Sequence, residues 1–414
     1  MANGTDGSGS VAPGRPAPWL HIVGIGEDGM DGLSPLTREV VASAEVIIGG
    51  DRHYSLAGVA GAERVPWPKP FDAMIDRIRS YKGRRVVVLV TGDPLWYSAG
   101  ARIGRTIDPV EITYHPNLSA FQLAAVRMGW SMADVETLTV HGRPVEQMIA
   151  FIQPGLRLLV LTTGSETPSR IAEFLTDRGY GQSPMTVFSS MGGPREERFD
   201  GLASEWDRAV PSFNTLAVEC VAAPDAALQP RVPGLSDDLF IHDGTMTKRE
   251  VRAVTLARLM PMRGALLWDI GCGCGSVAIE WLRATRHGQA VGIEPRRDRR
   301  VMAAQNALAL GTPGLELIDG QAPEALAGLE RPDAVFIGGG LSSEIVEASL
   351  EALRPLGRLA CNAVTLETEG ELLRLQRDLG GELVRLQVSR AAPVGTRLGW
   401  HPQMAVTQWS LVKR

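Results

Sequence analysis

Residues 266–275 read LLWDIGCGCG, and residues 276–284 that follow read SVAIEWLRA. An apolar run, a glycine-rich turn and a helical pattern in this order predict a β-strand that leads through the turn into an α-helix. Such a turn directs backbone N–H groups and the positive end of the helix toward a ligand. Because glycines have no side chain, the ligand can come close to the backbone. The stretch predicts a parallel α/β domain with a ligand site at the end of its first strand.

An acidic residue follows this turn at the distance expected of a nucleoside site. The next apolar run, VGIEP (291–295), ends in Glu294, about twenty residues after the turn. A carboxylate at this place can accept hydrogen bonds from both hydroxyls of a ribose. The series of strand, turn, helix, strand and acid therefore predicts a nucleoside-type cofactor.

Apolar runs and helical patterns alternate over the remaining chain, which is typical of α/β architecture with helices on both faces of the sheets. In the C-terminal half, 240–414, a helix is expected over 247–259, and strands are expected within 315–323, 333–340, 357–365, 382–389 and 405–412. In the N-terminal half, strands are expected over 20–26, 46–50, 85–93, 156–164 and 216–222.

Composition shifts set the predicted domain boundaries. Residues 1–18 are rich in Gly, Ser, Ala and Pro and are expected to be a disordered tail. A break near 113–119 divides the first domain, 19–222, into lobes of about 19–114 and 115–222. Residues 223–239, rich in Pro, Ala and Asp, are expected to be a linker.

Charge and composition exclude several classes of protein. The 414 residues are 44% hydrophobic and 21% charged, which is typical of a soluble globular protein. A net charge of -5 argues against nucleic-acid binding, and the cluster Arg296, Arg297, Arg299 and Arg300 is expected to cover a solvated helix face. The four cysteines form no disulfide or zinc pattern, and no stretch is apolar enough for a membrane span or a signal peptide. A cytoplasmic protein without a metal site is expected.

The C-terminal half resembles class I S-adenosylmethionine methyltransferases with a Rossmann-like fold. Their first loop, (D/E)xGxGxG, is matched by Asp269, Gly271, Gly273 and Gly275, and IDGQAPE (318–324) fits their adenine-binding segment. The resemblance implies that residues of these two segments and the acid after the second strand contact the cofactor. The implied contacts are Asp269, Gly271, Cys272, Gly273, Cys274, Gly275, Glu294, Asp319 and Ala322. From the residues alone, a helix or turn cap is the alternative interpretation of Asp319.

A segment before the first strand narrows the family. DGTMTKREVR (243–252) is similar to the entry segment of the decarboxylating methyltransferases of corrin biosynthesis, and this likeness implies that Thr247 helps to hold the cofactor. As a bare sequence, Thr247 followed by Glu250 is a capping box, and both interpretations are compatible.

The N-terminal half carries a GxGxxG string at Gly24, Gly26 and Gly29, but the next predicted strand ends in glycines and supplies no ribose-binding acid. The half instead resembles the two-lobed tetrapyrrole methylases. The ordered matches are VGIGEDGMDGLSPLT (23–37), VVLVTGDPLWYS (87–98), HPNLSAFQ (115–122), LTVHGR (138–143) and LTTGSETPSRIAEFL (161–175).

This second resemblance implies a cofactor folded in the cleft between the two lobes and held largely by the main chain. The implied contacts are Gly92, Asp93, Pro94, Ser119 and Thr162, with His141 and Arg143 facing substrate carboxylates. From the residues alone, Asp93 is equally a turn former and His141 equally a structural histidine.

Together the two resemblances imply an enzyme of cobalamin synthesis that uses S-adenosylmethionine twice. The C-terminal half is expected to methylate carbon 15 of precorrin-6B and to remove carbon dioxide from the ring C acetate; the N-terminal half is expected to methylate carbon 5, giving precorrin-8. The candidates to bind the carboxylates of this polyanion are Lys248, Arg249, Arg390 and Arg397. The likeness also implies a homo-oligomer, up to a tetramer, formed through the C-terminal half.

Three alternatives stay open at this point. The substrate is either metal-free or the cobalt-containing precorrin of the oxygen-independent pathway. A nicotinamide-dependent oxidoreductase would use a glycine loop of the same kind. A tetrapyrrole carrier or cofactor sensor would have the same two folds, with one of the two halves catalytically inactive.

Overall fold

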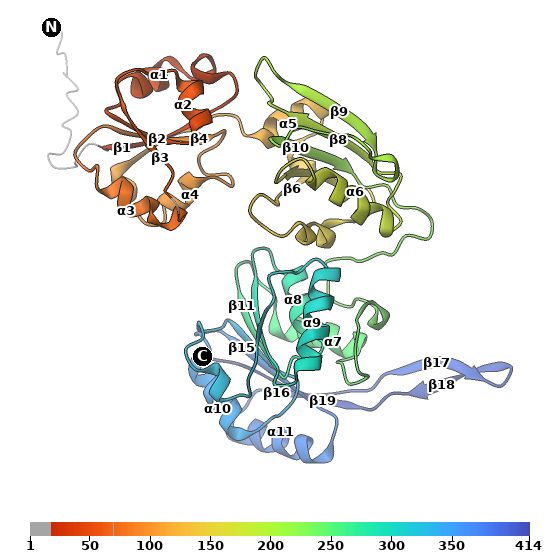
Figure 1. Cartoon of the computed structure of the whole chain (residues 1–414). Coiled ribbons are helices and arrows are strands. Elements are labelled where there is room, and N and C mark those ends of the chain that lie inside the picture. Colours follow the sequence, from red (N-terminus) through yellow and green to blue (C-terminus); the bar gives the residue numbers. More distant parts are fainter. Residues whose placement is uncertain (1–17, 69) are drawn as a thin grey trace, which may run out of the picture. The chain divides into compact units, whose positions relative to one another are not determined.

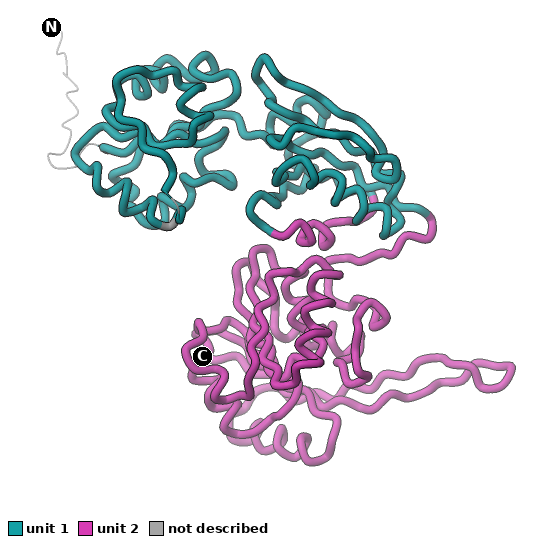
Figure 2. Tube along the Cα trace, viewed as in Figure 1, with its two compact units in different colours: residues 1–143, 155–223 teal, residues 144–154, 224–414 magenta. Residues whose placement is uncertain are grey.

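The computed structural model describes residues 18–68 and 70–414, so the predicted tail lies almost wholly outside the described residues. The chain divides into two compact units, each described by itself below (Figure 2). Unit 1 holds residues up to 143 together with 155–223, and unit 2 holds 144–154 together with 224–414.

Unit 1 begins with a five-stranded parallel sheet in the order β3-β2-β4-β1-β5. Its strands are β1 (Leu20–Ile25), β2 (Val46–Gly49), β3 (Glu63–Pro66), β4 (Val86–Thr91) and β5 (Ile112–His115). Its helices are α1 (Pro35–Ala42), α2 (Asp51–Ala57), α3 (Met74–Arg79) and α4 (Ala99–Ile103), with short 3-10 turns η1 (Gly29–Gly32), η2 (Phe71–Ala73) and η3 (Pro109–Glu111). Helices α1 and α2 pack on one face and α3 and α4 on the other, which is why β1 and β4 are continuous apolar runs.

The second sheet of unit 1 is mixed, in the order β6-β7-β10-β8-β9, with β6 and β7 parallel and the other pairs antiparallel. Its strands are β6 (Val135–Thr139), β7 (Arg157–Leu161), β8 (Pro184–Ser189), β9 (Glu197–Leu202) and β10 (Asn214–Glu219). Its helices are α5 (Ala120–Met128), α6 (Thr167–Asp177), η4 (Met132–Asp134) and η6 (Ala203–Glu205). Phe121 of α5 packs against Leu159 and Phe188 of the sheet.

Unit 2 is built on a seven-stranded sheet in the order β13-β12-β11-β14-β15-β19-β16, in which β19 alone runs antiparallel to its neighbours (Figure 1). Its strands are β11 (Leu266–Ile270), β12 (Gln289–Ile293), β13 (Glu316–Ile318), β14 (Ala334–Ile337), β15 (Arg358–Ala363), β16 (Glu382–Leu386) and β19 (Val406–Val412). Its helices are α7 (Arg249–Leu259), α8 (Ser276–Ala284), α9 (Arg297–Ala309), α10 (Ser343–Ala352) and α11 (Leu366–Leu379), with η5 (Val145–Phe151), η7 (Asp237–Leu239) and η8 (Glu324–Leu326).

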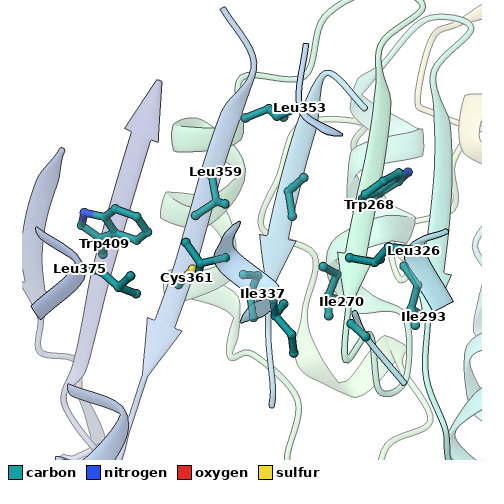
Figure 3. Packing of buried hydrophobic residues seen from close by; sticks show 14 of the residues in the cluster. Trp268, Ile270, Ile293, Leu326, Ile337, Leu353, Leu359, Cys361, Leu375 and Trp409 are labelled. Atoms are coloured by element: carbon teal, nitrogen blue, oxygen red, sulfur yellow. The ribbon is translucent and has the colours of Figure 1, made fainter. Parts of the chain in front are cut away.

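Successive residues of β11 are buried on opposite faces of this sheet. Trp268 and Ile270 lie in a cluster with the buried residues of α10 and α11 (Figure 3). Leu267 lies in another cluster with Leu256 of α7 and Trp281 of α8. Because both faces are covered, the strand is buried throughout and apolar except for Asp269, and the expected α/β class is confirmed.

Two features of unit 2 differ from the expectations. Residues 144–154, expected in the N-terminal domain, belong to unit 2, where η5 packs on α9 and the Arg231 guanidinium lies 4.5 Å from the centre of the Phe151 ring. The second is an unexpected two-stranded sheet, β17 (Ser389–Val394) and β18 (Arg397–Pro402), which extends away from the other strands (Figure 1). Both of its faces are largely exposed, so no alternation of buried residues marks it in the sequence.

A buried ion pair holds the start of unit 2 together. Arg252 of α7 and Glu280 of α8 are 0% and 1% exposed, and Nε of Arg252 lies 2.7 Å from Oε1 of Glu280. The guanidinium also donates to the carbonyls of Leu235 and Thr247, while the Glu280 carboxylate accepts from the backbone N–H of Gly234 and of Leu235. One pair therefore fixes the incoming linker and Thr247, two residues before α7.

We expect Glu280→Gln to destabilise unit 2 by about 2 kcal/mol or more, because it removes the fully buried counterion of Arg252 and leaves that charge with Asp237 alone, whose Oδ1 lies 3.0 Å from Nη1 of Arg252. The measurement is urea unfolding of the full chain followed by tryptophan fluorescence. The matched control is Glu382→Gln, which breaks the exposed pair with Arg258 and should cost at most about 1 kcal/mol. Equal effects of the two changes would contradict the role of the buried pair.

Candidate functional site

A cavity of about 380 Å³ opens in unit 2 at the carboxyl ends of β11, β12 and β14. Most of the cofactor contacts expected from the sequence line it. These are Thr247, Asp269, Gly271, Cys272, Gly273, Cys274, Glu294 and Ala322. The parallel strands bring these residues together because their carboxyl ends meet at one edge of the sheet.

The glycine loop is pinned by the acidic residue at the end of β12. The N–H of Gly273 donates to Oε2 of Glu294 at 3.0 Å, and the N–H of Arg296 donates to Oε1 at 3.0 Å. Gly273 has a φ of +57°, and a Cβ placed there would meet no atom within 4 Å, so it would project into open space. Each carboxylate oxygen of Glu294 keeps a lone pair for a further donor, such as a ribose hydroxyl.

Asp269 supplies a second buried carboxylate, one oxygen of which has no hydrogen-bond partner. Its Oδ2 accepts from the N–H of Ala278 at 3.0 Å, but its buried Oδ1 has no hydrogen-bond partner. Burial, with a smaller contribution from the charge of Glu294, raises the pKa of Asp269 to about 7. A buried acceptor without a partner on a cavity wall fits a ligand that brings a donor or a positive charge.

The two cysteines of the loop are not activated. Burial raises the pKa of both Cys272 and Cys274, so the thiols stay protonated at neutral pH. The Cys274 sulfur lies 3.9 Å from the Met246 sulfur, in a core cluster that includes Ile279. The thiols therefore pack beside the cavity rather than serving as nucleophiles.

The expected capping box at the start of α7 is wrong. The helix begins at Arg249, its N-cap is Lys248, and no side chain caps it. Thr247 precedes the cap and lines the cavity, while its carbonyl accepts from Arg252 at 2.7 Å.

Some expected residues of unit 2 lie away from the cavity lining. Gly275 is the N-cap of α8. The Asp319 carboxylate is paired with Arg300, and its side chain is 72% exposed, so Gly320, Gln321 and Ala322 form this part of the wall instead. The candidate carboxylate binders Lys248, Arg249, Arg390 and Arg397 also lie outside the lining, and Arg390 is paired with Glu250.

Two arginines expected on a solvated face line the cavity. Arg296 and Arg299 stand at the beginning of α9. They follow Glu294 by two and five residues. This closeness to the end of β12 could have identified them as candidate site residues. Met246 and the loop Gly338–Gly340 complete the wall and were likewise not expected.

In unit 1, three main-chain segments meet at or just after the carboxyl ends of β1, β4 and β5. A Cβ on Gly24 would lie 1.8 Å from the carbonyl oxygen of Gly92, and a Cβ on Gly92 would lie 3.0 Å from the Cα of Ser119. Ser119 is the N-cap of α5 in a capping box with Gln122. The two glycines let these segments pack closely, and Gly92 and Ser119, which meet here, are expected residues of the cofactor site.

The other expected residues of unit 1 have structural partners. Asp93, which precedes Pro94, accepts through Oδ1 from the N–H of Leu95 at 2.7 Å, as a turn-forming aspartate does. Thr162 is buried and donates to Asn214. His141 is exposed, and the exposed Arg143 guanidinium lies 5.8 Å from the centre of the Tyr97 ring.

The chemistry available at these places is that of binding and alignment. Backbone segments and three carboxylate residues, Asp243, Asp269 and Glu294, line the unit 2 cavity. Residues 18–68 and 70–414 contain no group of three or more His, Cys, Asp or Glu able to hold a metal ion. No helix in those ranges is long and apolar enough to cross a bilayer. A reaction with an activated leaving group, which needs little covalent help, suits such a site.

Comparison with known proteins covers both units. Residues 19–207 match the model of the Tetrapyrrole (Corrin/Porphyrin) Methylases, and residues 238–413 match the model of the Precorrin methyltransferase domain. A solved structure, the C-terminal domain of precorrin-6Y C5,15-methyltransferase from Rhodobacter capsulatus, is 45% identical and covers 45% of this chain and 100% of its own, with a TM-score of 0.43.

Two curated relatives align over nearly the whole chain. Precorrin-6Y C(5,15)-methyltransferase [decarboxylating] from Sinorhizobium sp is 43% identical over 97% of this chain and 98% of its own length. The protein of the same name from Mycobacterium tuberculosis is 37% identical over 95% of this chain and 100% of its own length. Identity at this level over the full length of both relatives shows that the chain belongs to the family of decarboxylating precorrin-6Y C5,15-methyltransferases.

Proposed function

We propose that unit 2 binds S-adenosylmethionine in its cavity, and the unpartnered Oδ1 of Asp269 is the observation that carries this proposal. When bound, this cofactor supplies an electrophilic methyl group on a positively charged sulfur. Two buried carboxylates, Asp269 and Glu294, favour a cation in the cavity, and Glu294 accepts from the ribose hydroxyls. The Gly273 backbone leaves the cofactor room to lie against the loop.

Unit 1 binds a second molecule of the same cofactor between its lobes. The supporting feature is the bare backbone where Gly24, Gly92 and Ser119 meet. Asp93, Pro94 and Thr162 remain candidate contacts through their main-chain groups.

The reaction that best fits the family is two C-methylations of precorrin-6B and one decarboxylation, giving precorrin-8. Unit 2 would hold the cofactor with its methyl group facing carbon 15, and unit 1 would hold a second molecule facing carbon 5. Each of these carbons would form a bond to the methyl group, while the sulfur would keep the electron pair of the broken carbon–sulfur bond. Carbon dioxide leaves the ring C acetate, the conjugated macrocycle takes up the electrons of that bond, and a proton from water then adds to the remaining carbon to give a methyl group, so no metal is required of the protein. The cationic side chains Lys248, Arg249, Arg390 and Arg397, with His141 and Arg143 in unit 1, are candidates to bind the substrate's carboxylates.

Product analysis with a loop variant tests this function. Mass spectrometry of the product from precorrin-6B, S-adenosylmethionine and the full chain should show two added methyl groups and the loss of one carbon dioxide. Gly273→Ala adds a methyl group that would project into the proposed cofactor site and should weaken binding at unit 2 at least about tenfold. At cofactor concentrations near or below the wild-type Kd, most of the product should then be methylated only at carbon 5.

The matched control is Gly264→Ala, since Gly264 also has a positive φ, of +75°, with open space around its Cβ, but lies outside the cavity lining. It should keep the wild-type product. Unchanged carbon-15 methylation by the Gly273 variant would refute the assignment of unit 2. Binding of NAD(P) without S-adenosylmethionine would favour an oxidoreductase, and turnover only of the cobalt-containing precorrin would place the enzyme in the oxygen-independent pathway.

The affinity of unit 2 for S-adenosylmethionine should rise as the pH increases from about 6 to about 8. Because the pKa of Asp269 is raised to about 7, the side chain is largely protonated below this range and ionised above it, where it attracts the cationic cofactor. In the unliganded protein the sign is opposite, since the folded form keeps this proton to higher pH than the unfolded chain and loses stability as the pH rises toward 7. Titration calorimetry of wild type and Asp269→Asn measures the effect, and an unchanged pH profile in the variant would contradict it.

We also propose that the chain forms a homo-oligomer through unit 2, with a second copy covering the sheet β17–β18. In the described ranges these strands pair only with each other, leaving both backbone edges free, and Leu398 and Trp400 are 75% and 76% exposed. Replacing both side chains by Ser should lower the molar mass measured by light scattering. Leu366→Ser, at an 82% exposed position of α11, is the control, and a monomeric wild type would contradict the proposal.

A further inference from the structure

Residues 243–247 form a strap without helix or strand that runs along the unit 2 cavity into α7. Asp243, Thr245, Met246 and Thr247 line the cavity. The strap therefore forms one wall of the cavity.

The two ends of the strap are held differently. At its C-terminal end, Met246 is buried in a core cluster, and the carbonyl of Thr247 accepts from the buried Arg252. At its N-terminal end, Asp243 and Thr245 are tied to Arg299 of α9, whose side chain is 23% exposed. One end is thus anchored in the core, while the other depends on a half-exposed polar contact.

That contact is a closed set of hydrogen bonds among three side chains. Arg299 donates from Nε to Oδ2 of Asp243 and from Nη2 to Oγ1 of Thr245, both at 2.9 Å. The Thr245 hydroxyl donates to Oδ1 of Asp243 at 2.6 Å, and the Thr245 N–H donates to the same oxygen at 3.1 Å. The planar fork of an arginine reaches both acceptors at once, which a lysine ammonium on a flexible stem does not reproduce.

The charge of this cluster suits the proposed occupant. Arg299 is neutralised by Asp243, and Arg296, the other arginine on the wall, is paired with Asp298. The two arginines thus add no uncompensated positive charge to a cavity that is to receive a cationic sulfur. The unpaired carboxylate oxygen of Asp269 keeps its attraction for the ligand.

We propose that Arg299 is a positioning residue that clamps the strap 243–247 over the unit 2 cavity, and that this clamp sets how long the cofactor stays bound. The proposal rests on the binding of S-adenosylmethionine by unit 2. It assigns to Asp243, Thr245 and Arg299 a joint role in closing the site, with the side chains of the clamp acting through the strap.

The test uses the full chain with Arg299→Gln, Asp243→Asn and the double variant. Hydrogen exchange of the strap amides in the unliganded protein reports the clamp itself, and stopped-flow displacement reports cofactor dissociation. Each single change should quicken strap exchange and speed dissociation from unit 2 about three- to tenfold, as expected for a half-exposed, doubly bonded ion pair. The double variant should be no worse than the more affected single variant, because both remove the same interaction.

The matched control is Arg297→Gln, two residues away on the exposed face of α9, which should leave exchange and dissociation unchanged. The unit 1 site, unaltered in every variant, serves as an internal reference. Unchanged exchange in Arg299→Gln, or faster exchange with unchanged dissociation, would overturn the proposal. A wild-type chain that takes up no S-adenosylmethionine would instead overturn the proposed function, while exchange would still report the clamp.

Discussion

The ion pair between Arg252 and Glu280 is the constraint on which the C-terminal unit depends. Two fully buried charges are costly to desolvate, so they persist only because each is satisfied by further hydrogen bonds. Those bonds reach the linker at Gly234 and Leu235 and the carbonyl of Thr247 on the cavity wall. The pair therefore couples the entry of the chain, the packing of α7 on α8 and the shape of the site.

Both candidate sites are built on main-chain segments that contain glycine, but the segments are held in place differently. In unit 1, glycines let three main-chain segments approach one another closely. In unit 2, Glu294 pins a glycine loop and Asp269 adds a buried acceptor. Neither arrangement depends on a nucleophile, which agrees with a transfer from a leaving group that carries its own activation.

Much of this architecture could be predicted because buried parallel strands leave continuous apolar runs in the sequence. The strand before Gly271 and the acid at Glu294 needed only local spacing to be recognised, and the structure places both on one cavity. Features that depend on distant partners could not be predicted. Arg299 looked like a surface residue because its partner Asp243 lies 56 positions earlier in the chain.

Other misses have equally specific causes. Thr247 and Glu250 have the spacing of a capping box, but α7 begins one residue too late to use it. The strands β17 and β18 have no buried face, so their sequence carries no alternating pattern. The site roles of the individual residues stay predictions until ligand binding is measured.

The membership of residues 144–154 in unit 2 has a consequence for any attempt to divide the chain. The polypeptide changes unit after 143, after 154 and again after 223, so three covalent connections join the two units. A cut after 223 would free a C-terminal fragment that lacks η5, with its buried Met148 and Ile149, and would uncover the surface of α9 on which η5 packs. A fragment that separates the two units therefore either keeps these eleven residues with the second half or leaves that surface of α9 uncovered.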